Sequence, residues 1–76
     1  MINIDLKLFA TLTEFLPENS ENYQVRDNIT IDKLLFKLGI KKDQAAIIFI
    51  NGIKKSHDTP LKQGDRVGIF PPVGGG

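Results

Sequence analysis

One amphipathic segment near the middle of the chain limits the possible folds more than any other feature. Thr30 is suited to cap the first turn of a helix, and Gly39 can adopt the positive φ that ends one. Ile29 and Leu34 occupy the two positions of a hydrophobic staple. Apolar residues recur between the caps at the i, i+3, i+4, i+7 spacing of one helical face: Ile31, Leu34, Leu35 and Leu38. The rest of the chain offers only a sheet to cover this face, so we predict a helix over residues 29–39 packed on strands.

Strand patterns flank this helix on both sides. Apolar and polar residues alternate over residues 2–8, which is typical of a half-buried strand, and residues 23–25 form a second, shorter strand candidate. Residues 46–50 are continuously apolar and precede Asn51 and Gly52, the pair that best suits a type I′ turn. We therefore predict a hairpin that returns through residues 53–54. A turn at Gly64 and Asp65 precedes a last strand over residues 66–70, in which Val67 and Ile69 share one side.

A second helical pattern is short. Residues 9–16 place Leu12, Phe15 and Leu16 at i, i+3, i+4, and Pro17 ends the pattern. The chain contains neither internal repeats nor a linker between domains. We predict an α+β fold in which a mixed sheet packs across one main helix, with a single domain over residues 1–70 and a flexible tail over residues 71–76.

Composition excludes several functions. A chain of 76 residues supports one core, and a domain of this size leaves much of its surface exposed, which disfavours an enclosed catalytic pocket. The formal charge of +1 is far from the basic balance of a nucleic-acid-binding domain. Cysteine is absent and His57 is the single histidine, so we expect no disulfide and no metal site. No signal peptide or apolar span is present, and we expect a cytoplasmic protein without a membrane partner.

The C-terminal segment carries the strongest functional signal. The sequence closes with Phe-Pro-Pro-Val-Gly-Gly-Gly over residues 70–76. The two prolines stop the last strand and stiffen the exit from the domain, because neither can donate a ladder hydrogen bond. Glycines contribute little to folding, but without Cβ atoms they can thread a narrow channel. We therefore predict that Gly74 and Gly75 are a channel-fitting stem and that the carboxylate of Gly76 is the reactive group.

Three apolar side chains are candidates for partner docking. Phe70 should project from the sheet face opposite Val67 and Ile69, where an exposed aromatic ring would anchor an interface. Phe9 and Ile53 are weaker candidates for the same patch. For His57 we predict a place in a surface loop, and for the paired lysines at 41–42 and 54–55 a solvated surface.

These residues bring the chain close to a known family. Residues 61–76, in the form Leu-x-x-Gly-Asp-x-Val-x-x-Phe-Pro-Pro-Val-x-Gly-Gly, resemble the C-terminal signature of the small subunit of molybdopterin synthase, the MoaD type. The Gly-Asp-x-Val part is shared with the thiamine-pathway carriers of the ThiS type. The opening strand followed by Phe9 and Ala10 also resembles the start of that family. Two departures are the short segment over residues 40–45, where such subunits often hold extra helix, and the third glycine, Gly74.

The resemblance implies a fold and a mechanism. The fold is the ubiquitin-like β-grasp, and the chain is a non-catalytic carrier subunit of a sulfurtransferase complex. An adenylating enzyme of the MoeB/ThiF type would use ATP to activate Gly76, a sulfur donor would convert it to a thiocarboxylate, and a MoaE-like large subunit would use the sulfur. The chain itself would bind no cofactor. The segment that docks into these partners would comprise Phe70, Pro71, Pro72 and Val73.

Three other functions stay open at this point. A sulfur carrier for thiazole synthesis and a ubiquitin-like modifier joined to lysines of other proteins would both use the same activated Gly76. A β-grasp binding module with an inert tail would not. The Phe-Pro-Pro-Val segment favours the molybdopterin branch, because it matches that family more specifically than the shared Gly-Asp-x-Val does.

Overall fold

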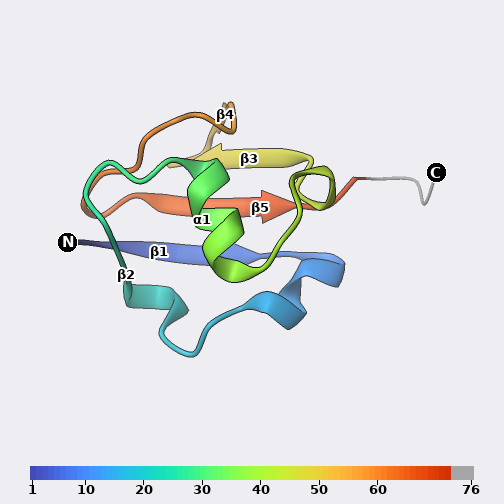
Figure 1. Cartoon of the computed structure of the whole chain (residues 1–76), viewed down its shortest axis with the longest axis horizontal. Helices are drawn as coiled ribbons and strands as arrows, with labels where there is room; N and C mark the ends of the chain where they lie inside the picture. The colour runs from blue at the N-terminus through green and yellow to red at the C-terminus, as the bar shows by residue number, and fades with distance from the viewer. Residues whose placement is uncertain (73–76) are drawn as a thin grey trace.

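The computed structural model describes residues 1–72, in which five strands form one mixed sheet and a single α-helix crosses it (Figure 1). The elements in chain order are β1 (Ile2–Leu8), η1 (Ala10–Phe15), η2 (Ser20–Asn22), β2 (Tyr23–Val25), α1 (Ile31–Leu38), η3 (Lys42–Gln44), β3 (Ile47–Ile50), β4 (Ile53–Lys55) and β5 (Arg66–Phe70). The strand order is β2-β1-β5-β3-β4; β1 and β5 are parallel, and the other neighbours are antiparallel. The predicted α+β fold is confirmed. Within residues 1–72 no helix has the length and apolarity that a membrane crossing requires.

The core lies between α1 and one face of the sheet. All four even-numbered residues of β1, from Ile2 to Leu8, are buried on this face. Val67 and Ile69 of β5 lie beside them, because parallel pairing sets Leu6 opposite Val67 and Leu8 opposite Ile69. The helix covers them with Ile31, Leu34 and Leu35, while Leu38, the fourth residue of the predicted stripe, is only partly buried.

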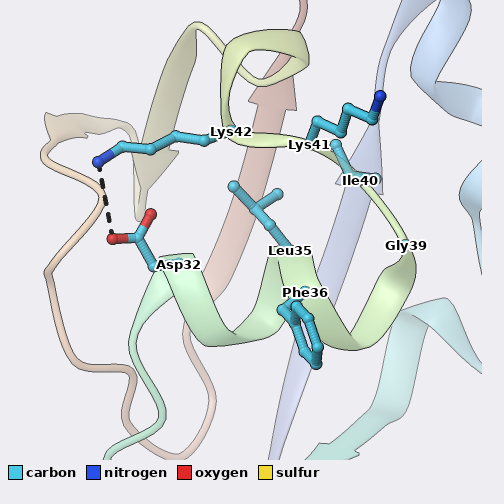
Figure 2. Close-up of a pocket in the computed structure, with 7 residues that line it drawn as sticks. All are labelled: Asp32, Leu35, Phe36, Gly39, Ile40, Lys41 and Lys42. Atoms are coloured by element: carbon cyan, nitrogen blue, oxygen red, sulfur yellow. Dashed lines mark ion pairs between the residues drawn. The ribbon is translucent and has the colours of Figure 1, made fainter.

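Local sequence determines where α1 ends. Gly39 has a φ of 83° and terminates the helix, with its N–H directed at the carbonyl groups of Leu35 and Phe36. The chain then turns back over the sheet, and Ile40 is buried beside Leu35 (Figure 2). The predicted helix over 29–39 is therefore correct in place and slightly long at both ends.

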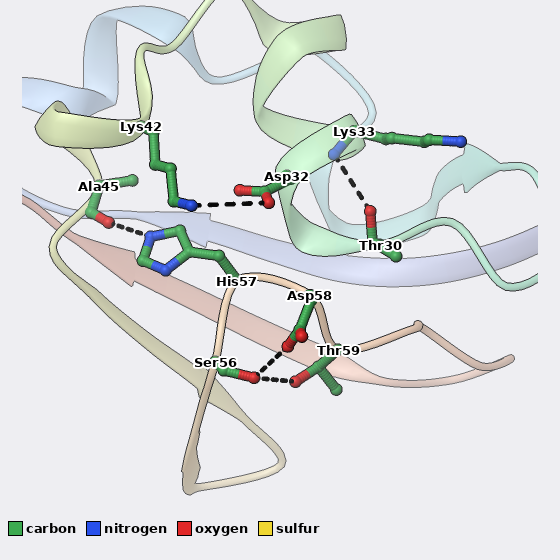
Figure 3. A network of polar contacts seen from close by, with 9 residues as sticks. All are labelled: Thr30, Asp32, Lys33, Lys42, Ala45, Ser56, His57, Asp58 and Thr59. Carbon is green, nitrogen blue, oxygen red and sulfur yellow. Dashed lines mark hydrogen bonds and ion pairs between the residues drawn. The ribbon is translucent and has the colours of Figure 1, made fainter.

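The N-terminus of α1 is capped by a side chain and by a distant loop. Thr30 Oγ1 accepts a hydrogen bond from the Lys33 N–H at 3.3 Å. The carbonyl oxygens of Thr59 and His57 accept from the N–H groups of Ile31 and Asp32, at 3.2 and 2.8 Å. The His57 ring is half-buried, with Nε2 2.6 Å from the Ala45 carbonyl oxygen (Figure 3). The loop prediction for His57 is correct, but its ring docks on the domain and thereby holds the loop against the helix.

The hairpin and the turn before β5 are tied to each other. Asn51 and Gly52 have φ angles of 54° and 81°, as the predicted type I′ turn requires. The Asn51 side chain donates to Asp65 Oδ1 and accepts from the Arg66 N–H, both at 2.9 Å. These bonds hold the hairpin turn beside the start of β5.

The first short helix differs from its prediction. Residues 10–15 form a 3₁₀-helix in which Leu12 is buried and Phe15 half-buried, whereas Leu16 is 41% exposed. A 3₁₀-helix has three residues per turn, so side chains at i and i+3 align while i+4 moves off the face. The expectation that Leu16 would share the apolar face is therefore wrong.

Candidate functional site

The sheet face that α1 does not cover carries the candidate site. Along β5 the buried Val67 and Ile69 alternate with Arg66, Gly68 and Phe70, which point to this outer face. Beyond Phe70 the chain leaves the sheet through Pro71, which is half-buried, and Pro72, which is exposed. Phe70 is therefore the last residue of β5 on the outer face, and the chain leaves the sheet directly after it.

Three phenylalanines gather at this end of the outer face, and we call Phe9, Phe49 and Phe70 the aromatic patch. The rings of Phe9 and Phe70 are stacked, with centroids 4.2 Å apart and an interplanar angle of 1°. Phe49 meets Phe70 edge-on at 5.8 Å and 83°. The Phe9 N–H donates to the Ile69 carbonyl oxygen at 3.2 Å, so the end of β1 is held beside β5. The Phe70 side chain points away from α1, as predicted, but it is half-buried by these neighbours instead of free.

Two shallow hollows flank the patch and share Phe49 and Phe70. One, of about 320 Å³, lies over Gly68, whose missing side chain leaves room between the rings. The other, of about 380 Å³, is bordered by Ile47, Pro71 and Pro72. The exposed atoms that line them are mostly apolar, as in the core of a protein interface, although charged side chains border the first hollow. Both hollows lie beside Phe70, the last residue of β5.

Charged residues border the patch on the side away from Pro71. The register sets Asp5 opposite Arg66 and Lys7 opposite Gly68, and all three charged side chains line the first hollow. Asp5 Oδ1 is covered and has no hydrogen-bond partner among residues 1–72. In the described part of the chain no three metal-ligating side chains lie together. The hollow over Gly68 therefore has an apolar floor and charged edges.

The structure brings together some of the predicted site residues and separates others. Phe9, Phe70 and Pro71 lie at one end of the outer face, as expected, with Pro72 beside them. Ile53 does not: it pairs with Ile50, whose side chain is buried toward α1, and directly paired residues share a face. The placement of Ile53 in this patch is therefore wrong. The remaining predicted residues lie outside the described residues: Val73, Gly74, Gly75 and Gly76.

Sequence reasoning missed Phe49. Residues 46–50 read as a continuous apolar run, which hides the alternation of β3. In the structure Ile48 and Ile50 are buried, and Phe49 is half-buried on the outer face. The Asn51–Gly52 turn could have predicted that Phe49 faces outward, because this turn fixes the register of the hairpin and hence the face of each residue.

Known proteins share this architecture. The family model described as "ThiS family" matches residues 6–76. Small archaeal modifier protein 3 of Haloferax volcanii is 29% identical, over 99% of this chain and all of that protein. The solution structure of the HVO 2177 protein of Haloferax volcanii aligns with a TM-score of 0.75 and 27% identity, over 99% of this chain and 87% of that one. A Pyrococcus furiosus protein proposed to be subunit 1 of a molybdopterin converting factor aligns with a TM-score of 0.71 and 24% identity, over 96% and 100%.

From residue 6 onward, the family model covers most of the sheet, the helix, the aromatic patch and the C-terminal glycines together. The structural neighbours have the same β-grasp arrangement over their full or nearly full length. The chain therefore belongs to the ThiS family, whose ubiquitin-like fold is that of sulfur carriers and small protein modifiers.

Proposed function

We propose that this chain is a sulfur carrier that supplies molybdopterin synthesis as the small subunit of molybdopterin synthase. Its reactive group would be the carboxylate of Gly76, and its folded domain would be the part that partner proteins bind. Family membership supports the carrier class. Within that class, the Phe-Pro-Pro-Val segment over residues 70–73 favours the molybdopterin branch.

The observation that carries the proposal is the position of the aromatic patch. A carrier has no active site of its own, so a partner must seat the domain before the last residues can enter the partner's catalytic centre. Phe70 belongs both to the patch and to the segment that leaves the sheet, and Pro71 and Pro72 border one of the apolar hollows. A partner that covers the patch would therefore hold the start of the C-terminal segment. Residues 73–75 would carry the carboxylate onward from there.

The chemistry requires activation of a poor electrophile. A carboxylate oxygen of Gly76 would attack the α-phosphorus of ATP, releasing pyrophosphate and forming an acyl-adenylate. Sulfur at the oxidation level of hydrogen sulfide would then attack the acyl carbon and expel AMP, leaving a thiocarboxylate. ATP and the catalytic groups belong to an adenylating partner of the MoeB/ThiF type. A MoaE-like large subunit would take the sulfur. Glycine at positions 74–76 suits this sequence of partners, because no side chain would obstruct a narrow channel.

A protein modifier is the second candidate function. The relationship to small archaeal modifier protein 3 extends over essentially the whole chain, which favours this candidate specifically. The activation step would be the same, and the acyl group would pass to a lysine amine in place of sulfur. A carrier for thiazole synthesis would differ from the main proposal only in the final acceptor.

Removal of Gly76 tests the activation of its carboxylate by ATP, the step that the sulfur-carrier and modifier candidates share. The deletion shortens the arm by about 3.5 Å and should withdraw the carboxylate from the adenylating centre. ATP-pyrophosphate exchange with the cognate activating enzyme should be lost, while the melting temperature stays unchanged. Gly75→Val should also impair exchange, because a β-branched side chain restricts the backbone and fills the channel. Exchange at the intact protein's rate after deletion would instead favour a binding module with an inert tail.

Mass spectrometry of protein isolated from its native host separates the candidates. A sulfur carrier should include a species heavier than the unmodified chain by the difference between one sulfur and one oxygen atom. The same measurement shows whether Gly76 is the last residue of the mature chain. A modifier should instead yield peptides of other proteins with lysines bearing a C-terminal glycine remnant. A gene deletion that abolishes thiazole synthesis and spares molybdopterin would contradict the main proposal.

A further inference from the structure

The outward side of α1 presents an aromatic ring that folding does not explain. Phe36 is 88% exposed, although its neighbour Leu35 is buried against the sheet. Phenylalanine has a lower helix propensity than leucine, lysine or alanine, so the helix gains nothing from it locally. An aromatic ring in water also raises the risk of unwanted association. Phe36 therefore contributes little to the stability of this domain.

Phe36 stands between two hollows of the surface. One, of about 560 Å³, runs along the C-terminal end of α1 and is lined by the apolar atoms of Leu35, Gly39 and Ile40 (Figure 2). The other, of about 830 Å³, extends toward the start of the chain and includes Met1 and Ile29. Because Phe36 has a hollow on each side, a partner's apolar side chains can contact the ring from both sides.

Cations surround this ring in excess of acids. The two hollows are lined by the positively charged side chains of Arg26, Lys33, Lys37, Lys41 and Lys42, against only Asp27 and Asp32. Both acids already have a cation: Asp27 Oδ1 lies 2.8 Å from the amino group of Met1, and Asp32 Oδ2 lies 3.9 Å from Lys42 Nζ (Figure 3). Lys37 Nζ donates to the Gln24 carbonyl oxygen at 3.3 Å and lies over the Tyr23 ring. Arg26, Lys33 and Lys41 are the cations of this face that these contacts do not use. Because the whole chain has a formal charge of only +1, this face holds a concentrated share of the positive charge.

We propose that Phe36 with Arg26, Lys33 and Lys41 forms a second docking surface, the basic helix face, whose occupant is an acidic protein segment with an apolar side chain between carboxylates. The apolar side chain would pack on Phe36 and enter a hollow, and the carboxylates would meet the lysines and Arg26. The basic helix face lies on the helix side of the sheet, whereas the aromatic patch lies on the opposite side. A partner could therefore bind here while another holds the aromatic patch and the C-terminal segment.

The charges and hollows favour this occupant over others. A two-fold dimer through this face would bring like charges together. Nucleic acid binding depends mainly on phosphate contacts, and it would leave the apolar linings of the two hollows unused. The acidic residues of this same chain offer one more possibility. Glu14, Glu18 and Glu21 lie in a stretch, residues 10–22, that contains no lysine or arginine. Head-to-tail association of copies through that stretch is an outcome that the test distinguishes.

The test is an NMR titration of the full-length ¹⁵N-labelled protein with synthetic peptides. The main probe carries a leucine pair flanked by glutamates; one comparison peptide replaces the glutamates with glutamine, and another replaces the leucines with serine. The main probe should shift amide signals of α1 and of residues 39–42, and both comparison peptides should bind at least roughly tenfold more weakly. Sedimentation of the protein alone should show a monomer.

Variants and matched controls make the test specific. Phe36→Ala and Lys33→Glu should each weaken binding by roughly tenfold, as loss of an anchor or of a paired charge does. Leu16→Ala and Lys62→Glu make comparable changes elsewhere on the surface and should leave binding unchanged. Phe36→Ala should melt at the same temperature as the unchanged protein or higher, which separates lost docking from lost folding. The protein without Gly76 should bind the peptide normally, so failure of the carrier proposal would not alter this result.

Four results would each overturn the proposal. Equal affinity for the glutamate and glutamine peptides would remove charge complementarity as the basis of recognition. Signal changes confined to the aromatic patch would place the peptide on the other face. Tighter binding of single-stranded polyuridylate than of the acidic peptide would assign the face to nucleic acid. Self-association that Glu18→Lys abolishes would identify another copy of the chain as the occupant.

Discussion

Gly68 offers a way to separate partner docking from folding. It lies in the middle of β5, on the outer face, paired with Lys7 on one side and Phe49 on the other. A Cβ atom added there would sit 3.5 Å from Phe9 Cε2 and 3.9 Å from Phe70 Cε1, which are ordinary van der Waals contacts. Gly68→Ala should therefore be accepted without movement of the backbone or the rings. The new methyl group would occupy the floor of the hollow between them.

Gly68→Ala should raise the stability of the fold and lower the affinity for a partner. A glycine inside a strand is less stable than alanine by about 0.5–1 kcal/mol, because it loses more backbone entropy on folding. For a domain of this size, that gain raises the melting temperature by about 2–8 °C. A partner side chain that rests on Gly68 would meanwhile be displaced. Affinity for the cognate adenylating enzyme should fall about tenfold, which corresponds to about 1.4 kcal/mol.

Thermal melts and titration calorimetry on the same preparation measure both effects. Gly64→Ala is the matched control, because the chemical change is the same but Gly64 has a φ of 83° and lies before the opposite end of β5. That variant should lose about 1–2 kcal/mol of stability, the cost of a left-handed conformation for a residue with a Cβ, and bind normally. If Gly68→Ala binds the enzyme as tightly as the unchanged protein, the hollow over Gly68 is not part of the docking surface. If it melts lower, the fit of the methyl group is wrong.

Three further predictions use the same assays. Leu35→Ala should cost about 2–5 kcal/mol in denaturant unfolding, because this side chain is buried beneath α1, and a loss below about half a kcal/mol would place it outside the core. Phe70→Ala should weaken enzyme binding and also lower stability by about 1–3 kcal/mol, since it removes two aromatic contacts worth about 0.5–1.5 kcal/mol each; an unchanged melt would contradict the stacked geometry. The Ser56 hydroxyl donates to Asp58 and holds the pKa of that carboxyl below its ordinary value of 3.8. The Asp58 carboxylate therefore stabilises the fold fully above pH 3.8, and this stabilisation is lost as the pH falls through the lower pKa of the folded state. Melts from neutral to strongly acid pH should show a smaller acid-induced loss in Asp58→Asn than in the unchanged protein.

The sequence by itself determined the elements whose signals are local. The helix cap at Thr30, the left-handed stop at Gly39 and the turn at Asn51 depend on residues a few positions apart, and all three appear in the structure where they were predicted. The alternation of β1 and β5 also shows which residues are buried, because the period of a strand is independent of its neighbours. The C-terminal signature likewise identified the family from the order of residues alone.

Only the tertiary structure decided how β1, β5 and the predicted hairpin lie beside one another, and hence how the candidate site is assembled. The parallel pairing of β1 with β5 joins the two ends of the sequence and stacks Phe9 on Phe70, a contact that no local pattern encodes. The pairing of β3 with β5 sets Phe49 opposite Gly68 and thereby adds Phe49 to the patch. Long-range pairing of this kind depends on which arrangement buries all the apolar faces together. A residue's spacing in the sequence predicts its face within one strand, whereas the sheet as a whole determines which side chains it meets.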